Sequence, residues 1–249
     1  MNTIVCIKRV PDSATRIRIA AGGRHIDPSG VKYVVNPYDE FALEEAIRRR
    51  EAAGGGTVTA ISVGPPEAAE ALRTALATGA DEAVLLVSEA THDGRAVARA
   101  LADEIGGREF DLLLFGKQAI DDDNMQVPQM VAEFLGLPCA TVVVALDIED
   151  GHAVARREVE GGHEVVEFDL PGVVSAQKGL NEPRYPSLKG IMAAKKKPLD
   201  EKPVTLAEPA LELVSLEEPP APSQGRIVGE GPDAVPELVS ALREEARVL

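Results

Sequence analysis

The sequence predicts an α/β fold: a doubly wound, mostly parallel Rossmann-like sheet with an antiparallel extension and an extended C-terminal arm. Nearly continuous apolar runs alternate with amphipathic helical segments up to Pro138, which is typical of βαβ units. Short strands separated by glycine-containing turns follow, which favours hairpins. Residues 198–249 hold 8 of the 18 prolines, so this last segment is expected to be extended.

Four apolar runs and four helical segments make up the first half of the chain. The apolar runs have the composition of strands covered on both faces: Thr3–Ile7, Thr57–Val63, Ala83–Val87 and Asp111–Phe115. The segments with helical periodicity lie between and after these runs: Asp39–Ala53, Pro66–Thr78, Asp93–Ile105 and Met125–Leu135. Because right-handed crossovers connect such strands, we expect a parallel sheet with helices on both faces.

The second half has a different pattern. Predicted hairpin strands are separated by turns at 149–151 and 160–162: Ala140–Ile148, Ala153–Val159 and Glu164–Phe168. Val173–Ala176 is a further buried strand, and Leu180–Lys197 has the composition of a loop. We therefore divide the chain into an α/β domain of residues 1–197 and an arm of residues 198–249. The arm ends in an amphipathic helix, Asp233–Leu249, which either folds back on its own domain or wraps a second subunit.

Composition and charge exclude several classes of protein. With 26 Lys and Arg against 41 Asp and Glu, the 249 residues carry a formal net charge of −15, which repels nucleic acid. No apolar run reaches the roughly 20 residues that a membrane span requires, so no membrane insertion is expected. The N-terminus has the reverse order of a secretory signal. Cys6 and Cys139 lie in apolar runs, which favours a reducing compartment.

Common catalytic and cofactor motifs are missing from the sequence. It contains neither the dinucleotide motif Gly-x-Gly-x-x-Gly nor the P-loop motif, and no Gly-x-Ser-x-Gly elbow. The four histidines, at positions 25, 92, 152 and 163, have no partner at a metal-binding spacing. Polar residues at the carboxyl ends of the parallel strands are then the candidates for ligand binding.

The stretch from Gly116 to Val127 follows the fourth strand and leads into a helix. Gly116 allows a ligand to approach the backbone, and the helix N-terminus offers N–H groups to a phosphate. Asp123 or Asn124 could cap that helix, and Lys117 could supply a cation. The alternative is a solvated acidic turn, since three consecutive aspartates repel phosphate unless backbone donors or Lys117 offset them.

Two further stretches combine unusual residues. Asn36-Pro37-Tyr38-Asp39 precedes the first long helix, where a structural role as helix entry is the default and the Tyr38 ring could pack on a planar cofactor. Within Leu180–Lys197, five cations accompany a single acid, Glu182, and apolar residues lie between them. Such an apolar anchor with a positive rim suits docking onto acidic partners.

Together these stretches resemble the β subunit of electron-transfer flavoproteins, the smaller chain of an αβ heterodimer. The matching residues are Val-Lys-Tyr-Val-Val-Asn-Pro-Tyr-Asp-Glu at 31–40 and on to residue 46, Gly-Lys-Gln-Ala-Ile-Asp-Asp-Asp at 116–123, and the stretch 180–197. Arg-Thr-Ala-Leu-Ala-Thr-Gly-Ala-Asp at 73–81 is a weaker match. The resemblance runs in order from residue 3 to about residue 200.

The resemblance implies an adenine nucleotide α-hydrolase-like fold and a structural AMP in this chain, with FAD held mainly by the α subunit. It implies that Tyr38 lies near the flavin edge. The implied AMP contacts are Cys6, Asn36, Pro37, Tyr38, Asp39, Val63, Gly116, Lys117, Gln118, Ala119, Ile120, Asp121, Asp122, Asp123, Asn124, Met125, Gln126 and Val127.

The resemblance also implies a role as electron carrier, without catalytic residues of its own. Leu188 matches the anchor that inserts into acyl-CoA dehydrogenases and similar flavoenzymes of fatty acid oxidation, and electrons pass on to a quinone oxidoreductase. The implied docking residues are Arg184, Tyr185, Leu188, Ile191 and Met192. The arm would embrace the α subunit, and a bacterial cytoplasm is favoured over a mitochondrial matrix.

Other functions stay open from the sequence. A bifurcating subunit would hold a second FAD where AMP lies, although members of that type tend to have Gly-Asp-Thr where this chain has Asp122-Asp123-Asn124. A stand-alone adenine-nucleotide-binding protein would suit the same sheet, and a pure scaffold subunit would leave the pocket empty.

Overall fold

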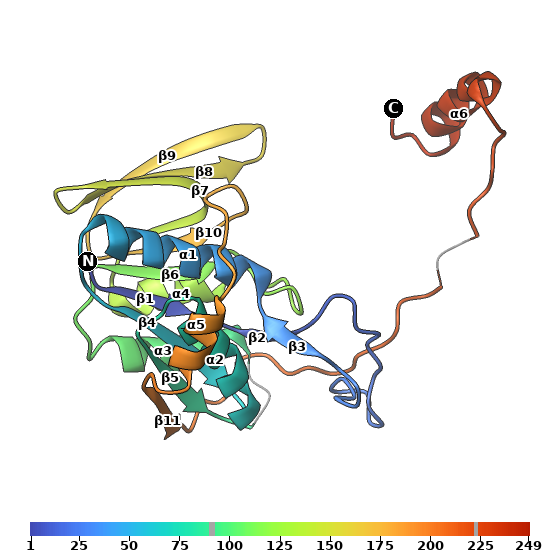
Figure 1. The fold of residues 1–249 in the computed structure, drawn as a ribbon. Coiled ribbons are helices and arrows are strands. Elements are labelled where there is room, and N and C mark those ends of the chain that lie inside the picture. The colour runs from blue at the N-terminus through green and yellow to red at the C-terminus, as the bar shows by residue number, and fades with distance from the viewer. Residues whose placement is uncertain (90–92, 222–223) are drawn as a thin grey trace.

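A computed structural model of the chain describes residues 1–89, 93–221 and 224–249. Within these ranges the main sheet has nine strands in the order β11-β5-β4-β1-β6-β10-β7-β8-β9 (Figure 1). The parallel strands are β1 (Thr3–Cys6), β4 (Val58–Gly64), β5 (Glu82–Val87), β6 (Leu112–Gly116), β7 (Cys139–Glu149), β10 (Gly172–Ala176) and β11 (Leu199–Pro203). Strands β8 (His152–Val159) and β9 (Gly162–Asp169) extend the sheet in antiparallel fashion. The predicted mostly parallel, doubly wound sheet with an antiparallel extension is confirmed.

Helices cover both faces of the parallel strands. Helices α1 (Pro37–Ala52) and α2 (Ala69–Thr78), the latter preceded by a 3₁₀ turn at Pro66–Ala68, pack on one face. Helices α3 (Gly94–Ile105) and α4 (Val127–Leu135) pack on the other. Successive strand residues alternate between the two cores, as the two-residue period of a strand requires.

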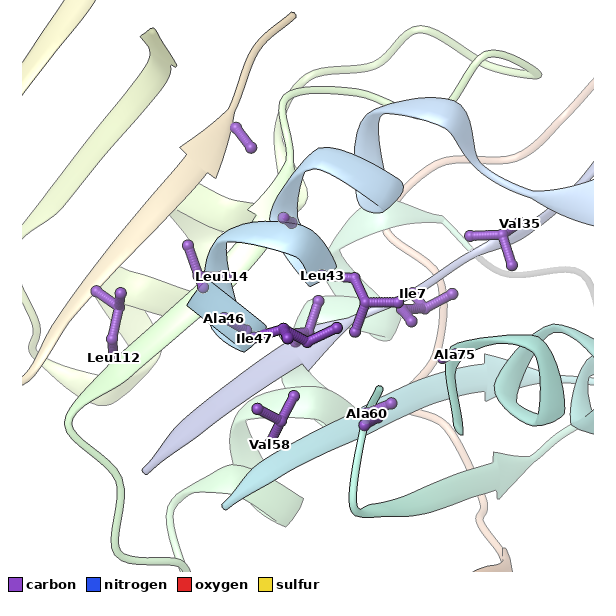
Figure 2. Packing of buried hydrophobic residues seen from close by; sticks show 14 of the residues in the cluster. Ile7, Val35, Leu43, Ala46, Ile47, Val58, Ala60, Ala75, Leu112 and Leu114 are labelled. Carbon is purple, nitrogen blue, oxygen red and sulfur yellow. The ribbon is translucent and has the colours of Figure 1, made fainter. Parts of the chain in front are cut away.

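The first core is built from α1 against the centre of the sheet. Figure 2 shows Leu43 of α1 beside Ile7, and Ala46 and Ile47 between Leu114 of β6 and Val58 of β4. The side chain of Ile47 is completely buried, and such burial contributes about 1.5–3 kcal/mol to folding. This packing fixes the first turn of α1 against the carboxyl ends of the strands.

Three elements differ from the sequence prediction. A two-stranded antiparallel sheet, β2 (Arg9–Pro11) and β3 (Tyr33–Val35), leads into α1 and was not predicted. Helix α5 (Leu188–Ala194) lies inside the predicted loop of residues 180–197. Strand β11 forms in the predicted arm, at the edge of the sheet, where proline is tolerated because one side of the strand needs no partner. The boundary between residues 1–197 and 198–249 stays a prediction.

Beyond β11 the chain forms an extended arm. The backbone N–H of Leu216 donates to the carbonyl oxygen of Gly23 at 2.6 Å, which among the described residues is the last backbone hydrogen bond between the arm and the body before the terminal helix. A 3₁₀ turn at Pro232–Ala234, helix α6 (Val235–Ser240) and a π turn at Ala241–Glu245 then account for most of the predicted terminal helix. None of their residues is buried, and α6 stands away from the sheet (Figure 1). Within the described ranges, no helix is long and apolar enough to cross a membrane.

Candidate nucleotide pocket and docking surface

A pocket opens at the carboxyl ends of β1, β4 and β6. It lies where the chain order reverses about β1, the position at which doubly wound sheets bind ligands. Most of the residues predicted to bind a nucleotide line it: Cys6, Asp39, Val63, Gly116, Lys117, Gln118, Ala119, Asp122, Asn124, Met125, Gln126 and Val127.

Asn36 supports the pocket from behind. Its side chain is 1% exposed; Nδ2 donates to the carbonyl oxygen of Gln118 at 2.8 Å, and Oδ1 accepts from the N–H of Ile120 at 3.2 Å. Asn36 is at the N-cap position of α1 but its side chain does not cap the helix. It ties the loop after β6 to the start of α1, so Asn36 and Ile120 shape the pocket without lining it.

Asp39, in the first turn of α1, joins the same parts of the chain. Its carboxylate is 5% exposed and accepts hydrogen bonds from the N–H of Lys8 at 2.7 Å, from the N–H of Gly116 at 3.1 Å and from Asn36 Nδ2 at 2.9 Å. Burial raises the pKa of Asp39 to about 7, although these donors act in the opposite direction. A Cβ on Gly116 would lie 2.4 Å from Asp39 Oδ1, so the glycine is required here by the packing of Asp39.

Each of the three consecutive aspartates has a side-chain partner within the chain. Lys8 Nζ lies 2.9 Å from both Asp121 Oδ1 and Asp122 Oδ2, and Gln118 Nε2 donates to Asp123 Oδ1 at 2.5 Å. From the sequence, Lys117 was the candidate for this role, but its ammonium group lies 4.9 Å from the centre of the Tyr38 ring. The aspartates therefore hold the loop in place, and Lys8 offsets part of their repulsion of a phosphate.

Helix α4 begins two residues later than predicted. Asp123 and Met125 have φ values of 50° and 51°, in the left-handed region, so the helix cannot start at Met125. The N-cap residue is Gln126, with no side-chain cap, and the proposal that Asp123 or Asn124 caps α4 is wrong. The N–H groups of the first turn are thus left to solvent or a ligand, and Gln126 and Val127 at this end line the pocket.

Nine residues of the lining were not predicted from the sequence. They are Ile7, Lys8, Ile61, Ser62, Gly94, Val97, Leu101, Phe115 and Pro128. Ile7, Lys8 and Ser62 stand at or just beyond the ends of strands, so the strand-end rule could have found them. Val97 and Leu101 enter only through the packing of α3. Pro37, Tyr38, Asp121 and Asp123, also predicted to bind the nucleotide, do not line the pocket. No metal-binding group of three or more acidic, histidine or cysteine side chains occurs among the residues described, and His92 lies outside them.

A second surface forms on α5. The side chains of Leu188 and Met192, one turn apart, are 83% and 73% exposed, Ile191 is 45% exposed, and Tyr185 just before the helix is 93% exposed. Lys189, Lys195 and Lys196 are also exposed. We call these seven residues the α5 surface. They combine large apolar side chains with positive charge, as the sequence predicted.

Arg184 and Lys197 are bound within the chain. The guanidinium of Arg184 donates to Glu44 Oε2 at 2.8 Å and to Glu51 Oε1 at 2.7 Å, both on α1. Burial opposes ionisation of Glu44, but the hydrogen bonds from Arg184 and Arg48 leave its pKa below the ordinary value. The role of Arg184 in docking stays a prediction, with its charged group directed at α1.

Comparison with known proteins shows the family of the chain. The family description "Electron transfer flavoprotein domain" matches residues 24–207. The electron transfer flavoprotein subunit beta of Bacillus subtilis (strain 168) is 44% identical over 260 residues, covering 100% of both chains. The protein of the same name from Bradyrhizobium diazoefficiens is 40% identical over 255 residues, again covering 100% of both. The one from Sus scrofa is 40% identical over 257 residues, covering 100% of this chain and 99% of its own. The chain therefore belongs to the electron transfer flavoprotein family, among its β subunits.

Proposed function

We propose that this chain binds AMP in the pocket and pairs with an α subunit that holds FAD, forming an electron carrier. The observation that supports it is that most of the residues implied as AMP contacts, far apart in sequence, meet in one pocket at the carboxyl ends of β1, β4 and β6. AMP is then a structural ligand, and redox chemistry is supplied by the flavin when it is bound. The chain itself acts as a carrier subunit, not as an enzyme.

The pocket has separate places for the two ends of AMP. Ile61, Val63, Val97, Leu101 and Phe115 offer an apolar wall for the adenine. The uncapped first turn of α4 offers backbone N–H groups and a positive dipole end for the phosphate. Lys8 reduces the repulsion of this phosphate by Asp121 and Asp122. Tyr38, beside Lys117, is the ring that we expect to lie near the flavin.

Identification of the nucleotides tests this proposal. The αβ complex is purified, denatured, and the released nucleotides are identified by mass and quantified. We expect one AMP and one FAD for each complex. Two FAD and no AMP would instead identify a bifurcating subunit, for which the same pocket would hold the second flavin. Nucleotide turnover by the isolated chain would support a stand-alone nucleotide-binding protein.

We further propose that the α5 surface docks partner flavoenzymes such as acyl-CoA dehydrogenases, from which electrons pass through the flavin to a quinone oxidoreductase. Exposed apolar side chains surrounded by lysines suit a partner with an apolar pocket and an acidic rim. The arm, with α6 unburied, is proposed to cover the α subunit, and the cytoplasm of a bacterium is the proposed compartment.

The variant Leu188→Ala tests the docking proposal. Removing the anchor is expected to lower kcat/KM for electron transfer from an acyl-CoA dehydrogenase by about tenfold, because interface anchors contribute about 1–2 kcal/mol or more. Flavin content and αβ assembly should not change. Val165→Ala on β9 is the matched control, since Val165 is also an exposed apolar residue, at 63%. Unchanged kinetics in Leu188→Ala would refute docking through α5.

A further inference from the structure

We propose that Arg73 and Lys197 form a reciprocal clamp between α2 and α5 that fixes the orientation of the α5 surface, so that Arg73 is a positioning residue for partner docking. This inference rests on the proposed docking function. It gives a role to the stretch 73–81, which belongs to neither the pocket nor the α5 surface.

Arg73 on α2 holds the end of α5. Its Nη1 donates to the carbonyl oxygen of Ala194, the last residue of α5, at 2.8 Å and to that of Lys197 at 2.9 Å. The last carbonyl groups of a helix have no partner within it, so a cation placed there both satisfies them and complements the helix dipole. Arg73 therefore fixes the C-terminal end of a helix of only seven residues, which could not persist alone.

Lys197 makes the converse contact. Its ammonium group donates to the carbonyl oxygens of Leu76 at 2.9 Å and Ala80 at 2.5 Å, at the C-terminal end of α2. Burial lowers the pKa of Lys197, with Arg50 acting in the same direction and Asp81 against it. Arg73 on α2 thus caps the C-terminal end of α5, and Lys197, just after α5, caps that of α2. The two C-terminal ends cannot separate without losing both sets of hydrogen bonds.

The middle and the start of α5 are also held. A Cβ on Gly190 would lie 2.2 Å from the carbonyl oxygen of Ala77, so the backbones of α5 and α2 touch at this point. Ser187 caps the N-terminus by accepting from the N–H of Gly190 at 3.0 Å. Ala194 is 4% exposed in the core, whereas Leu188 and Met192 point away from it. One face of α5 is fixed, and the other is free to bind.

A fixed helix matters for docking because ordering a mobile segment on binding reduces affinity. Immobilising each flexible side chain costs about 0.5–1.5 kcal/mol, and ordering backbone costs more. With the clamp, α5 is already ordered when the protein folds, so docking does not have to order it. Its loss should leave the αβ complex assembled with its flavin, and should weaken docking through Leu188.

A double-mutant cycle tests the inference in the intact αβ complex. Arg73→Gln removes the donors to α5. Arg99→Gln on α3 is the matched control, since Arg99 pairs with Asp103 and lies over the Phe134 ring, both away from α5. In electron transfer from an acyl-CoA dehydrogenase to the αβ complex, we expect Arg73→Gln to raise KM about five- to tenfold and to leave kcat unchanged. Amide hydrogen exchange in α5 should become faster. Arg73→Lys should restore part of the affinity, and Lys197→Gln should reproduce the loss from the other side of the clamp.

The cycle with Leu188→Ala separates this inference from the function on which it rests. If Arg73 acts by positioning Leu188, the double variant should dock no worse than Leu188→Ala alone, within about twofold. If the losses of the two single variants multiply in the double variant, the clamp alone is overturned. The same holds if Arg73→Gln and Lys197→Gln both have wild-type KM while Leu188→Ala is impaired. A Leu188→Ala complex with wild-type kinetics would overturn the docking function and the clamp together.

Discussion

The nucleotide pocket and the α5 surface are organised in opposite ways. In the pocket, polar side chains such as Asn36 and Asp39 are buried and bonded to one another, and they hold a loop around a hollow. On α5, apolar side chains are exposed, and the polar contacts of Arg73, Arg184 and Lys197 hold the helix from beneath. A small polar ligand requires donors fixed in a hollow, while a protein partner requires an apolar anchor on a fixed base. The two sites should therefore fail differently when altered.

The largest expected effect is in the pocket. Asn36→Ala leaves the carbonyl oxygen of Gln118 and the N–H of Ile120 without their partner and creates a small cavity. We expect the free energy of unfolding to fall by about 2–3 kcal/mol, with a lower melting temperature and loss of bound nucleotide. Thermal unfolding and nucleotide quantification measure both. Gln129→Ala is the control, because the Gln129 side chain donates to the nearby carbonyl oxygen of Met125 and does not join distant parts of the described chain. A stable variant that retains nucleotide would show that Asn36 does not support the pocket.

A smaller effect of pH is expected in the same network. Burial raises the pKa of Asp39 to about 7 in the folded state, above its value near 3.8 in the unfolded chain. The folded state then binds the proton of Asp39 more tightly than the unfolded chain does. The contribution of Asp39 to stability is therefore present at low pH and is lost as the pH rises through 7. Between pH 6 and 7 the loss should be about 1 kcal/mol.

Comparison with Asp39→Asn isolates this contribution. All other titrating groups are common to both proteins. The difference between their free energies of unfolding, measured by denaturant titration from pH 5 to 8, should therefore show the pH dependence that Asp39 causes. This difference should become smaller as the pH rises. A difference in unfolding free energy that is constant over this range would mean that Asp39 is already ionised at pH 5.

The same contrast explains what the sequence could predict. The strands and helices of the first half, and the loop at Gly116, follow from periodicity and from the rule that ligands bind at strand ends. The ion pairs of Lys8 with Asp121 and Asp122 span more than a hundred residues, and no local pattern indicates them. Helix α5 has the composition of a loop, with Pro186 before it and Gly190 inside it, and is helical because α2 and the core hold it. Tertiary contacts decide both cases.

The smallest expected effect concerns the charges around the α5 anchor. Lys195 and Lys196 are exposed, so they act on an acidic partner mainly through long-range attraction before contact. The double variant Lys195→Ala with Lys196→Ala should lower the association rate with an acyl-CoA dehydrogenase about threefold at low salt. At 0.5 M salt the difference should vanish, because the screening length is then only about 4 Å. The defect of Leu188→Ala should persist at both salt concentrations, since burial of its side chain does not depend on screening. Stopped-flow measurements of both variants at the two concentrations compare them directly. A salt-independent loss in the lysine variant would mean that these lysines make direct contacts in the complex and belong to the anchor itself.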